Sequence, residues 1–357
     1  MIGFALVGCG RIAVRHADLL ASGQIAGARL AAVCDVKPER AAAFGERYGV
    51  PHFTDMHAMV QAEDRRIDVL SILTESGKHA AHCLALAPYG KHIVVEKPMA
   101  LTLDDADTMI HACDAAGVKL FVVKQNRYNL PVQAARKALL DGRFGRLVMG
   151  TVRVRWCRTQ AYYDQDPWRG TWALDGGVFA NQASHHIDLL EWFLGEPLSV
   201  FARARTALVD IEAEDTGVAV ITFRNGALGI VEATTATRPV DLEGSLSILG
   251  ETGTVEIAGF AVNEVRTWAF AREEANDEGI RRGGEAPPNV YGFGHRAYLN
   301  NVVDAIANGG PSLVDGLEGR KSLELISGIY ESIATRTEVN LHFNPRLSRL
   351  GERLPPH

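Results

Sequence analysis

The chain has 357 residues, which is long for one domain and sufficient for two. Its hydrophobic content of 47%, with 22% charged residues, is that of an ordinary globular protein. The formal net charge of −6 argues against nucleic acid as the main partner. The apolar run at the N-terminus is too short for a secretory signal or a membrane span, so we expect no membrane partner.

Five cysteines are scattered along the chain, mostly inside apolar segments. Their odd number and their placement favour reduced thiols and a cytoplasmic location over a disulfide framework. Neither C-x-x-C nor H-E-x-x-H spacing occurs, so we expect no dedicated metal site.

The first third of the chain alternates short apolar runs with amphipathic stretches. The predicted strands are residues 4–7, 30–34, 69–72, 93–95 and 120–123, and the predicted helices are 12–21, 38–48, 78–89 and 103–116. Near-continuous apolar strands between helices indicate a parallel sheet covered on both faces. We therefore predict an α/β protein whose residues 1–124 form a Rossmann-type dinucleotide-binding domain.

A G-x-G-x-x-A pattern follows the first predicted strand. Gly8 supplies the backbone freedom for a sharp turn, and Gly10 lets a pyrophosphate approach the main chain. The next helix begins near Arg11 and Ile12 and offers free N–H groups to the phosphates. Asp35, at the end of the second strand, is placed to hold a ribose diol, which favours NAD over NADP. The alternative is that Asp35 caps a turn.

From residue 125 onward the pattern changes. Residues 147–156 alternate strictly, which indicates a half-buried strand of an antiparallel sheet. Further strands are predicted at 200–206, 217–223, 226–234, 245–249, 254–257 and 264–267, helices at 131–140, within 176–194, at 295–307 and at 317–336, and a long mobile loop at 272–289. We predict a C-terminal domain, residues 125–357, with a large open mixed or antiparallel sheet and helices on one face.

Two stretches carry candidate proton-transfer groups. Lys97, in Glu96-Lys97-Pro98, follows a buried strand and can donate to a substrate hydroxyl or act as a base if desolvation lowers its pKa. A solvated lysine paired with Glu96 explains the same local sequence equally well. In the second stretch, neighbouring residues of a helix point about 100° apart, so only one of His185 and His186 shares a face with Asn181 and Asp188. That residue is His185, whereas we expect His186 to pack or cap and Asp188 to support the helix.

Arginines and aromatic residues are interleaved between residues 153 and 172. Guanidinium groups suit phosphate or carboxylate, and aromatic faces suit sugar rings or a uracil. We interpret Arg153 and Arg155 as the solvated face of a strand. Arg158 and Arg169 lie beyond that strand, and we expect them to contact an anion.

Together these motifs resemble the Gfo/Idh/MocA oxidoreductases. The residues that carry the resemblance are Gly8, Gly10, Ala13, Asp35, Thr74 with His79, Glu96-Lys97-Pro98, Gly176-Gly177, and Asn181 with His185 and Asp188. Segments 124–128, 156–158 and 162–172 are similar to one branch, the bacterial UDP-N-acetylglucosaminuronate 3-dehydrogenases of surface-polysaccharide (lipopolysaccharide) sugar biosynthesis.

The resemblance implies an NAD-dependent dehydrogenase that converts the C3 hydroxyl of a UDP-linked uronate to a ketone, with Lys97 and His185 as catalytic residues. Which of the two removes the proton is left open. The implied cofactor-binding residues are Gly8, Gly10, Arg11, Ile12, Asp35, Thr74, His79, Glu96, Lys97, Gln125, Trp168 and Arg169. The implied substrate-binding residues are Lys97, Arg127, Arg158, Tyr163, Asn181 and His185.

The resemblance also implies a homo-oligomer, a dimer or a tetramer, built through the open sheet face. Three alternatives remain for the activity: another sugar or inositol dehydrogenase of the family, an NAD-using glycoside hydrolase, and a non-enzymatic dinucleotide sensor. Two positions depart from the family pattern. Glu75 replaces the usual proline after Thr74, and Asn181 replaces an aspartate and so contributes no charge to His185.

Overall fold

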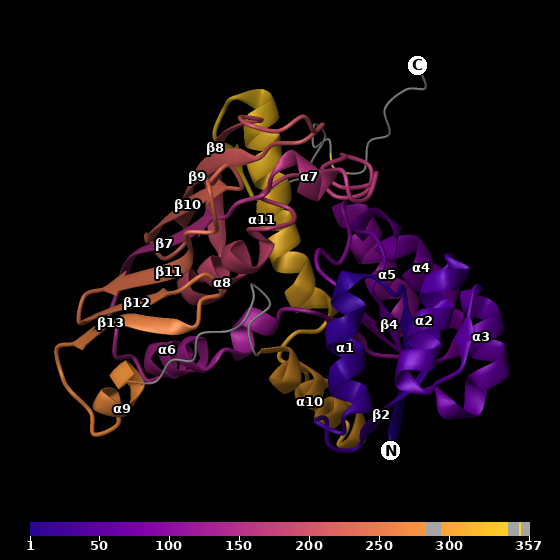
Figure 1. Ribbon diagram of the computed structural model, residues 1–357. Coiled ribbons are helices and arrows are strands. Elements are labelled where there is room, and N and C mark those ends of the chain that lie inside the picture. The colour runs from indigo at the N-terminus through magenta and orange to yellow at the C-terminus, as the bar shows by residue number, and fades with distance from the viewer. Residues whose placement is uncertain (283–293, 342–349, 351–357) are drawn as a thin grey trace. The chain divides into compact units, whose positions relative to one another are not determined.

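The computed structural model describes residues 1–282, 294–341 and 350, which fall into two units. The first unit comprises Met1–Val123 and His295–Arg320, and the second comprises Lys124–Gly294 and the chain from Lys321 on. Figure 1 shows the chain and labels many of their helices and strands. Among the described residues, no helix combines the length and the apolar character needed to cross a membrane.

The first unit is built on a six-stranded sheet in the order β3-β2-β1-β4-β5-β6, and every neighbouring pair is parallel. Its strands are β1 (Ile2–Val7), β2 (Ala28–Cys34), β3 (His52–Phe53), β4 (Val69–Ile72), β5 (His92–Val95) and β6 (Leu120–Val122). Its helices are α1 (Arg11–Ala21), α2 (Pro38–Tyr48), α3 (Met56–Glu63), α4 (His79–Leu86), α5 (Leu103–Ala115) and α10 (Gly294–Ala307). The parallel α/β architecture is therefore confirmed. The two-residue strand β3 and the helix α3 were not predicted.

Residues 295–320 return to the first unit from far along the chain. The Val122 N–H donates to the Val314 carbonyl at 3.3 Å, and the Lys119 ammonium donates to the Gly310 carbonyl at 2.8 Å. Arg320 forms an ion pair with Asp107 of α5. The sequence-based division assigned this segment to the C-terminal domain, whereas its contacts group it with the parallel sheet.

The second unit contains an eight-stranded mixed sheet in the order β13-β12-β11-β7-β10-β9-β8-β14. Its strands are β7 (Leu147–Arg155), β8 (Pro197–Arg205), β9 (Thr216–Phe223), β10 (Leu228–Thr234), β11 (Glu243–Gly250), β12 (Gly253–Ala258), β13 (Glu264–Phe270) and β14 (Val339–Asn340). Strands β7 and β10 pair in parallel, and the other neighbours pair antiparallel. This confirms the predicted mixed sheet.

The second unit contains the helices α6 (Leu130–Leu140), α7 (Gln160–Tyr163), α8 (Ser184–Leu194) and α9 (Asp277–Arg282). Helix α11 (Gly316–Thr335) begins in the first unit and continues into the second from Lys321. Helix α9 lies within the stretch 272–289 that the sequence predicted as a loop, so that prediction is wrong for its six residues. Residues 283–289 of the same stretch lie outside the described residues.

The two faces of the mixed sheet differ. Helix α8 packs against one face, where Leu190 lies against Gly150 of β7 (Figure 1). On the other face, alternate positions of the strands expose apolar side chains, and Val218 and Val220 are each 51% exposed. This face also carries Phe201 and Leu228. Oligomer formation through this open face stays a prediction.

A buried carboxyl group shapes the loop that leads into α8. Glu214 accepts hydrogen bonds at the same oxygen from the Phe179 N–H at 3.1 Å and the Tyr330 hydroxyl at 2.9 Å. The Tyr330 oxygen in turn accepts the N–H groups of Gly177 and Ala180. A Cβ at Gly177 would overlap the Glu214 carboxyl group, so glycine is required at this approach. Burial raises the pKa of Glu214 to about 7.

The raised pKa predicts a pH dependence of stability. An unfolded chain releases the Glu214 proton near its ordinary pKa of 4.5, whereas the folded chain keeps it up to about pH 7. The folded state then binds more protons between these values, so stability falls as pH rises through that window. In urea unfolding, Glu214→Gln should remove up to about 3 kcal/mol of this loss between pH 5 and pH 8.

Glu196→Gln serves as the control, because it alters an exposed carboxylate that pairs with Arg224. Its free energy of unfolding should change with pH as steeply as that of the parent chain. An unchanged slope in Glu214→Gln would show that this carboxyl group is already ionised in the folded protein at pH 5.

Candidate functional site

The turn from β1 into α1 has the geometry that a dinucleotide phosphate requires. Gly8 has a φ of +100°, its N–H donates to the Cys34 carbonyl of β2 at 2.8 Å, and a Cβ there would meet the Leu73 carbonyl at 2.9 Å. Gly10 is the N-cap of α1, and a Cβ there meets no described atom within 4 Å. The main chain at Gly10 is therefore open to a phosphate, and the first N–H groups of α1 follow.

Asp35, directly after β2, contacts this turn through its carboxylate. One carboxylate oxygen accepts the Cys9 N–H at 2.8 Å, and the other accepts the Lys37 N–H at 2.8 Å. The second contact is the turn-capping role that was weighed as the alternative for Asp35. The two roles are compatible, because each carboxylate oxygen accepts more than one hydrogen bond.

His79 connects the ends of two neighbouring strands. Its Nε2 lies 3.1 Å from the Thr74 carbonyl after β4, and its Nδ1 lies 2.8 Å from the Pro98 carbonyl after β5. A neutral imidazole donates through only one nitrogen, and burial lowers the pKa of His79. His79 thus supports the loop structurally. Its contact with the cofactor, like that of Thr74, stays a prediction.

Lys97 lies directly after β5 and is half-buried. Its backbone N–H donates to a carboxylate oxygen of the preceding residue, Glu96, at 3.1 Å. Glu96 itself is 6% exposed and lies in the interior. The Glu96 carboxylate, which the alternative interpretation paired with a solvated lysine, is therefore buried, and it accepts from the Lys97 main chain.

In the second unit, His185 lies in the first turn of α8. The Gln125 side-chain nitrogen lies 2.9 Å from the His185 Nε2. Because an amide nitrogen only donates, the ring nitrogen that faces it accepts, and a neutral His185 then carries its proton on Nδ1. His185 is in this arrangement a proton acceptor at Nε2. Gln125 thus contacts the predicted base, and its contact with the cofactor stays a prediction.

His186, the next residue, packs as predicted. It is fully buried and its ring stands edge-on to the Trp156 ring, with centroids 5.8 Å apart. Burial lowers the pKa of His186 to about 4, so the ring is neutral at pH 7. Of the two neighbouring histidines, His186 belongs to the core.

Asp188, in α8, forms a buried ion pair with Arg127. Its two oxygens accept from Nε and Nη2 of Arg127, each at 2.8 Å. Lys124 lies 3.5 Å from the same carboxylate and donates to the Ser322 hydroxyl at 2.5 Å. Burial raises the pKa of Asp188, but the charges of Arg127 and Lys124 outweigh burial and keep the carboxylate ionised. Asp188 thus connects α8 to the segment of Lys124 and Arg127, whereas its support of the helix and of ring orientation, like substrate contact by Arg127, stays a prediction.

Glu191, one turn further along α8, was not predicted to matter. Burial and the nearby Asp188 charge raise its pKa to about 8, so it is protonated at neutral pH. The buried cluster therefore holds two carboxyl groups in different protonation states. The sequence contained a signal for this pair, since Asp188 and Glu191 are three residues apart and share a helix face.

Asn181 lies before α8, which begins at Ser184, so the expected shared helix face of Asn181 and His185 is wrong. Its amide nitrogen donates to Asp175, which also accepts the Gly170 N–H at 2.8 Å. A carboxylate, that of Asp175, therefore lies in contact with the Asn181 side chain. Sequence reasoning missed Asp175 because it lies outside the motif.

The arginines beyond β7 lie among aromatic rings. Arg158 lies over the rings of Trp156 and Tyr162, at 5.3 and 5.4 Å from their centroids. Arg169 lies over Tyr162 and Trp168, at 4.7 and 4.5 Å. The result is an alternating stack of cations and rings, which fixes both guanidinium groups.

Each stacked arginine also has a carboxylate. Arg158 pairs with Asp241 at 2.9 Å, and Arg169 pairs with Asp166 at 3.2 Å. Tyr163, a predicted substrate contact, is 5% exposed and lies with its hydroxyl 3.1 Å from the Thr235 hydroxyl. Contacts of these residues with cofactor or substrate stay predictions.

Arg153 and Arg155 behave as the solvated face of β7. Both approach Glu232, with Arg155 at 2.6 Å, and both side chains are 35% exposed. Arg155 also lies 3.2 Å from Glu243. These ion pairs across the sheet account for both arginines without a ligand.

Comparison with known proteins agrees with this geometry. Residues 2–124 match the model of the oxidoreductase family with an NAD-binding Rossmann fold, and residues 132–256 match the GFO/IDH/MocA C-terminal domain. The chain is thus an NAD-dependent oxidoreductase. It belongs to the Gfo/Idh/MocA family. The open main chain at Gly10 and the carboxylate of Asp35 fit NAD as its cofactor.

Two solved structures are similar over nearly the whole chain. The WlbA dehydrogenase from Bordetella pertussis, in complex with NADH and UDP-GlcNAcA, is 43% identical, with a TM-score of 0.89 and coverage of 96% of this chain and 98% of that one. The WlbA dehydrogenase from Chromobacterium violaceum, with the same two ligands, is 42% identical, with a TM-score of 0.89 and coverage of 95% and 96%.

Characterised sequences of the family are more distant. A D-apiose dehydrogenase from Paraburkholderia graminis is 29% identical, over 94% of this chain and 89% of the relative. A myo-inositol 2-dehydrogenase from Thermotoga maritima is 28% identical, over 94% of this chain and 97% of the relative.

The two turn glycines predict different consequences of the same substitution. Gly8→Ala forces a Cβ into a positive φ and against the Leu73 carbonyl, so it should lower the free energy of unfolding by about 1–3 kcal/mol. Gly10→Ala adds a methyl group in open space and should leave that free energy within about 0.5 kcal/mol. It should nevertheless weaken NADH binding about tenfold or more, because the methyl group obstructs the pyrophosphate.

Urea unfolding and NADH fluorescence titration measure the two effects. Unchanged NADH affinity in Gly10→Ala would place the pyrophosphate elsewhere.

Proposed function

We propose that the chain oxidises the C3 hydroxyl of UDP-N-acetylglucosaminuronate to a 3-keto sugar, with NAD as hydride acceptor, in surface-polysaccharide sugar biosynthesis. The observation that carries the proposal is the 43% identity, across 96% of the chain, to a dehydrogenase solved with NADH and UDP-GlcNAcA. The relatives that act on apiose and inositol are 28–29% identical over a similar length.

The stacked arginines support an anionic substrate. A uronate and a diphosphate both carry charge that a guanidinium group binds, and a uracil or sugar ring suits the aromatic faces beside it. Arg158 and Arg169 are held between rings and are paired with one aspartate each, so they are already ordered before a ligand arrives. A neutral polyol would require neither arginine.

The reaction removes a hydride and a proton from the same alcohol. NAD, when bound, supplies the hydride acceptor. We assign the proton to His185, whose Nε2 faces a donor and is therefore unprotonated in the neutral ring. We assign to Lys97 a hydrogen bond to the alcohol oxygen, which stabilises the negative charge that develops there.

A substrate panel tests the proposal directly. Purified protein with NAD and UDP-N-acetylglucosaminuronate should form NADH or, if the cofactor stays bound, should accumulate a 3-keto product when 2-oxoglutarate is added to reoxidise it. The comparison substrates are myo-inositol, glucose and nitrophenyl glycosides. None of them should be turned over at a rate near that of the nucleotide sugar. Turnover of a neutral polyol without turnover of the nucleotide sugar would favour the inositol-type alternative, and glycoside cleavage without net NADH would favour the hydrolase.

Variants at the two proton-handling residues test their roles. Lys97→Met and His185→Asn should each lower kcat about 100-fold or more while NADH affinity changes less than about threefold. The expected difference between them is in the pH profile, where loss of His185 should abolish the lower limb. Lys137→Met and His111→Asn change exposed residues and serve as controls. Normal kcat in either catalytic variant would remove that residue from the mechanism.

A further inference from the structure

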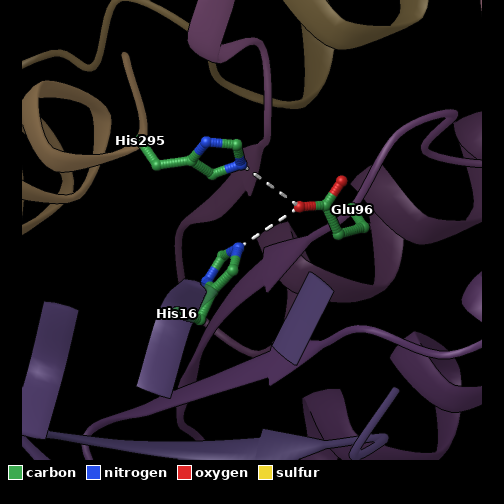
Figure 2. A group of neighbouring side chains, drawn as sticks. All are labelled: His16, Glu96 and His295. Atoms are coloured by element: carbon green, nitrogen blue, oxygen red, sulfur yellow. Dashed lines mark hydrogen bonds and ion pairs between the residues drawn. The ribbon is translucent and has the colours of Figure 1, made fainter. Parts of the chain in front are cut away.

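Three buried side chains of the first unit converge behind the loop that carries Lys97 (Figure 2). His16 comes from α1, Glu96 follows β5, and His295 lies at the start of α10. The His16 Nε2 lies 3.2 Å from one Glu96 oxygen, and the His295 Nε2 lies 4.0 Å from the same oxygen. The three residues are between 0 and 6% exposed.

The second oxygen of Glu96 has a different partner. It accepts the backbone N–H of Lys97 at 3.1 Å. One carboxylate therefore connects two histidines on one side to the main chain of the predicted catalytic lysine on the other. Neither histidine is part of the motifs that the sequence singled out.

The ionisation of Glu96 depends on this surrounding. Burial raises the pKa of Glu96, but the hydrogen bond and charge of His16, together with the charges of His295 and Lys97, outweigh burial and lower it. His79 is the further titratable group whose pKa responds to Glu96. A buried carboxylate deprived of such donors protonates instead of remaining charged.

Two imidazoles and a carboxylate with ligand atoms within 4.8 Å of one another are also a donor set that Zn²⁺ uses. A histidine that binds a metal almost always donates its other ring N–H to a carboxylate, carbonyl or water. Among the described residues, the His16 Nδ1 has no hydrogen-bond partner. The 3.2 Å separation is that of a hydrogen bond, so the geometry favours a proton shared between side chains over a metal.

We propose that His16 and His295 are positioning residues for Lys97. Through Glu96 they fix the peptide that precedes the lysine and keep a negative charge beside its ammonium group. The inference rests on the proposed function only in giving Lys97 a hydrogen bond to the alcohol oxygen of the substrate. It makes α1, the helix that begins at the dinucleotide turn, a support of the catalytic loop as well.

The test compares His16→Leu, His16→Gln and His295→Leu with the full-length parent. The leucine variants remove the ring donor, whereas glutamine retains an amide donor near the position of Nε2. His92→Leu is the matched control, because His92 accepts a hydrogen bond from the Lys119 N–H at the opposite end of the same strand. The first readout is the pH dependence of Lys97 labelling by an amine-reactive reagent, followed by peptide mass spectrometry.

In His16→Leu and His295→Leu, Glu96 loses a partner and protonates more readily, so the Lys97 ammonium loses a neighbouring charge. The pH midpoint of Lys97 labelling should fall by about one unit. On the proposed substrate, kcat should fall about tenfold or more while KM changes less than about threefold. His16→Gln should restore part of the labelling midpoint and part of kcat. If His16→Leu does not fold, His16→Gln and His295→Leu still provide the comparison with the parent. His92→Leu should match the parent in both.

Unchanged Lys97 labelling in the folded His16 and His295 variants would overturn the inference, even in an enzyme that turns over normally. Stoichiometric zinc in the purified parent, lost from both leucine variants, would overturn it as well. Labelling requires no substrate, so inactivity of the parent on the nucleotide sugar would refute the proposed function and leave this result standing.

Discussion

Parallel strand pairing is the constraint on which the first half of the site depends. Because β1, β2, β4 and β5 run in the same direction, their carboxyl ends lie at one edge of the sheet. The glycine turn, Asp35, Thr74 and Lys97 all follow those ends. Hydrogen bonds between successive ends then fix the edge, since Cys9 donates to Asp35 and His79 reaches the carbonyls after β4 and β5.

In the second unit, buried charge has the corresponding role. A carboxylate in the interior costs several kcal/mol unless donors surround it, and Asp188 has a bidentate arginine and a lysine. At Glu191, a turn away, burial and the Asp188 charge outweigh the charges of Arg127, Lys124 and Lys321 and raise the pKa to about 8, so this carboxyl group is protonated at neutral pH. The contacts of Arg127 with Asp188 and of Lys124 with Ser322 connect the segment before α6 and the first half of α11 to the helix that carries His185.

The sequence predicted what local pattern dictates. Apolar periodicity located the strands of both sheets except the two-residue β3 and β14, and the glycine spacing located the turn at Gly8, because a positive φ excludes most other residues there. It could not predict the contacts made across long sequence separations. His295 beside Glu96 and the return of residues 295–320 to the first unit carry no local signature. Asp175 is near Asn181 in the sequence, but it lies outside the motif that drew attention to Asn181. Helix α9 was missed because the charge and glycine around it mask a short helix.

The contact between Asn181 and Asp175 makes the two positions interdependent in evolution. The amide of Asn181 donates to Asp175, so an aspartate at 181 would set two carboxylates against each other where Asp175 is 1% exposed. One of them would have to stay protonated, and the loop would lose a donor. Aspartate at 181, the residue of the family pattern, is therefore unfavourable beside Asp175, whereas exchanging the two residues together preserves the bond. Alignments of close relatives should therefore show these two sites changing as a pair.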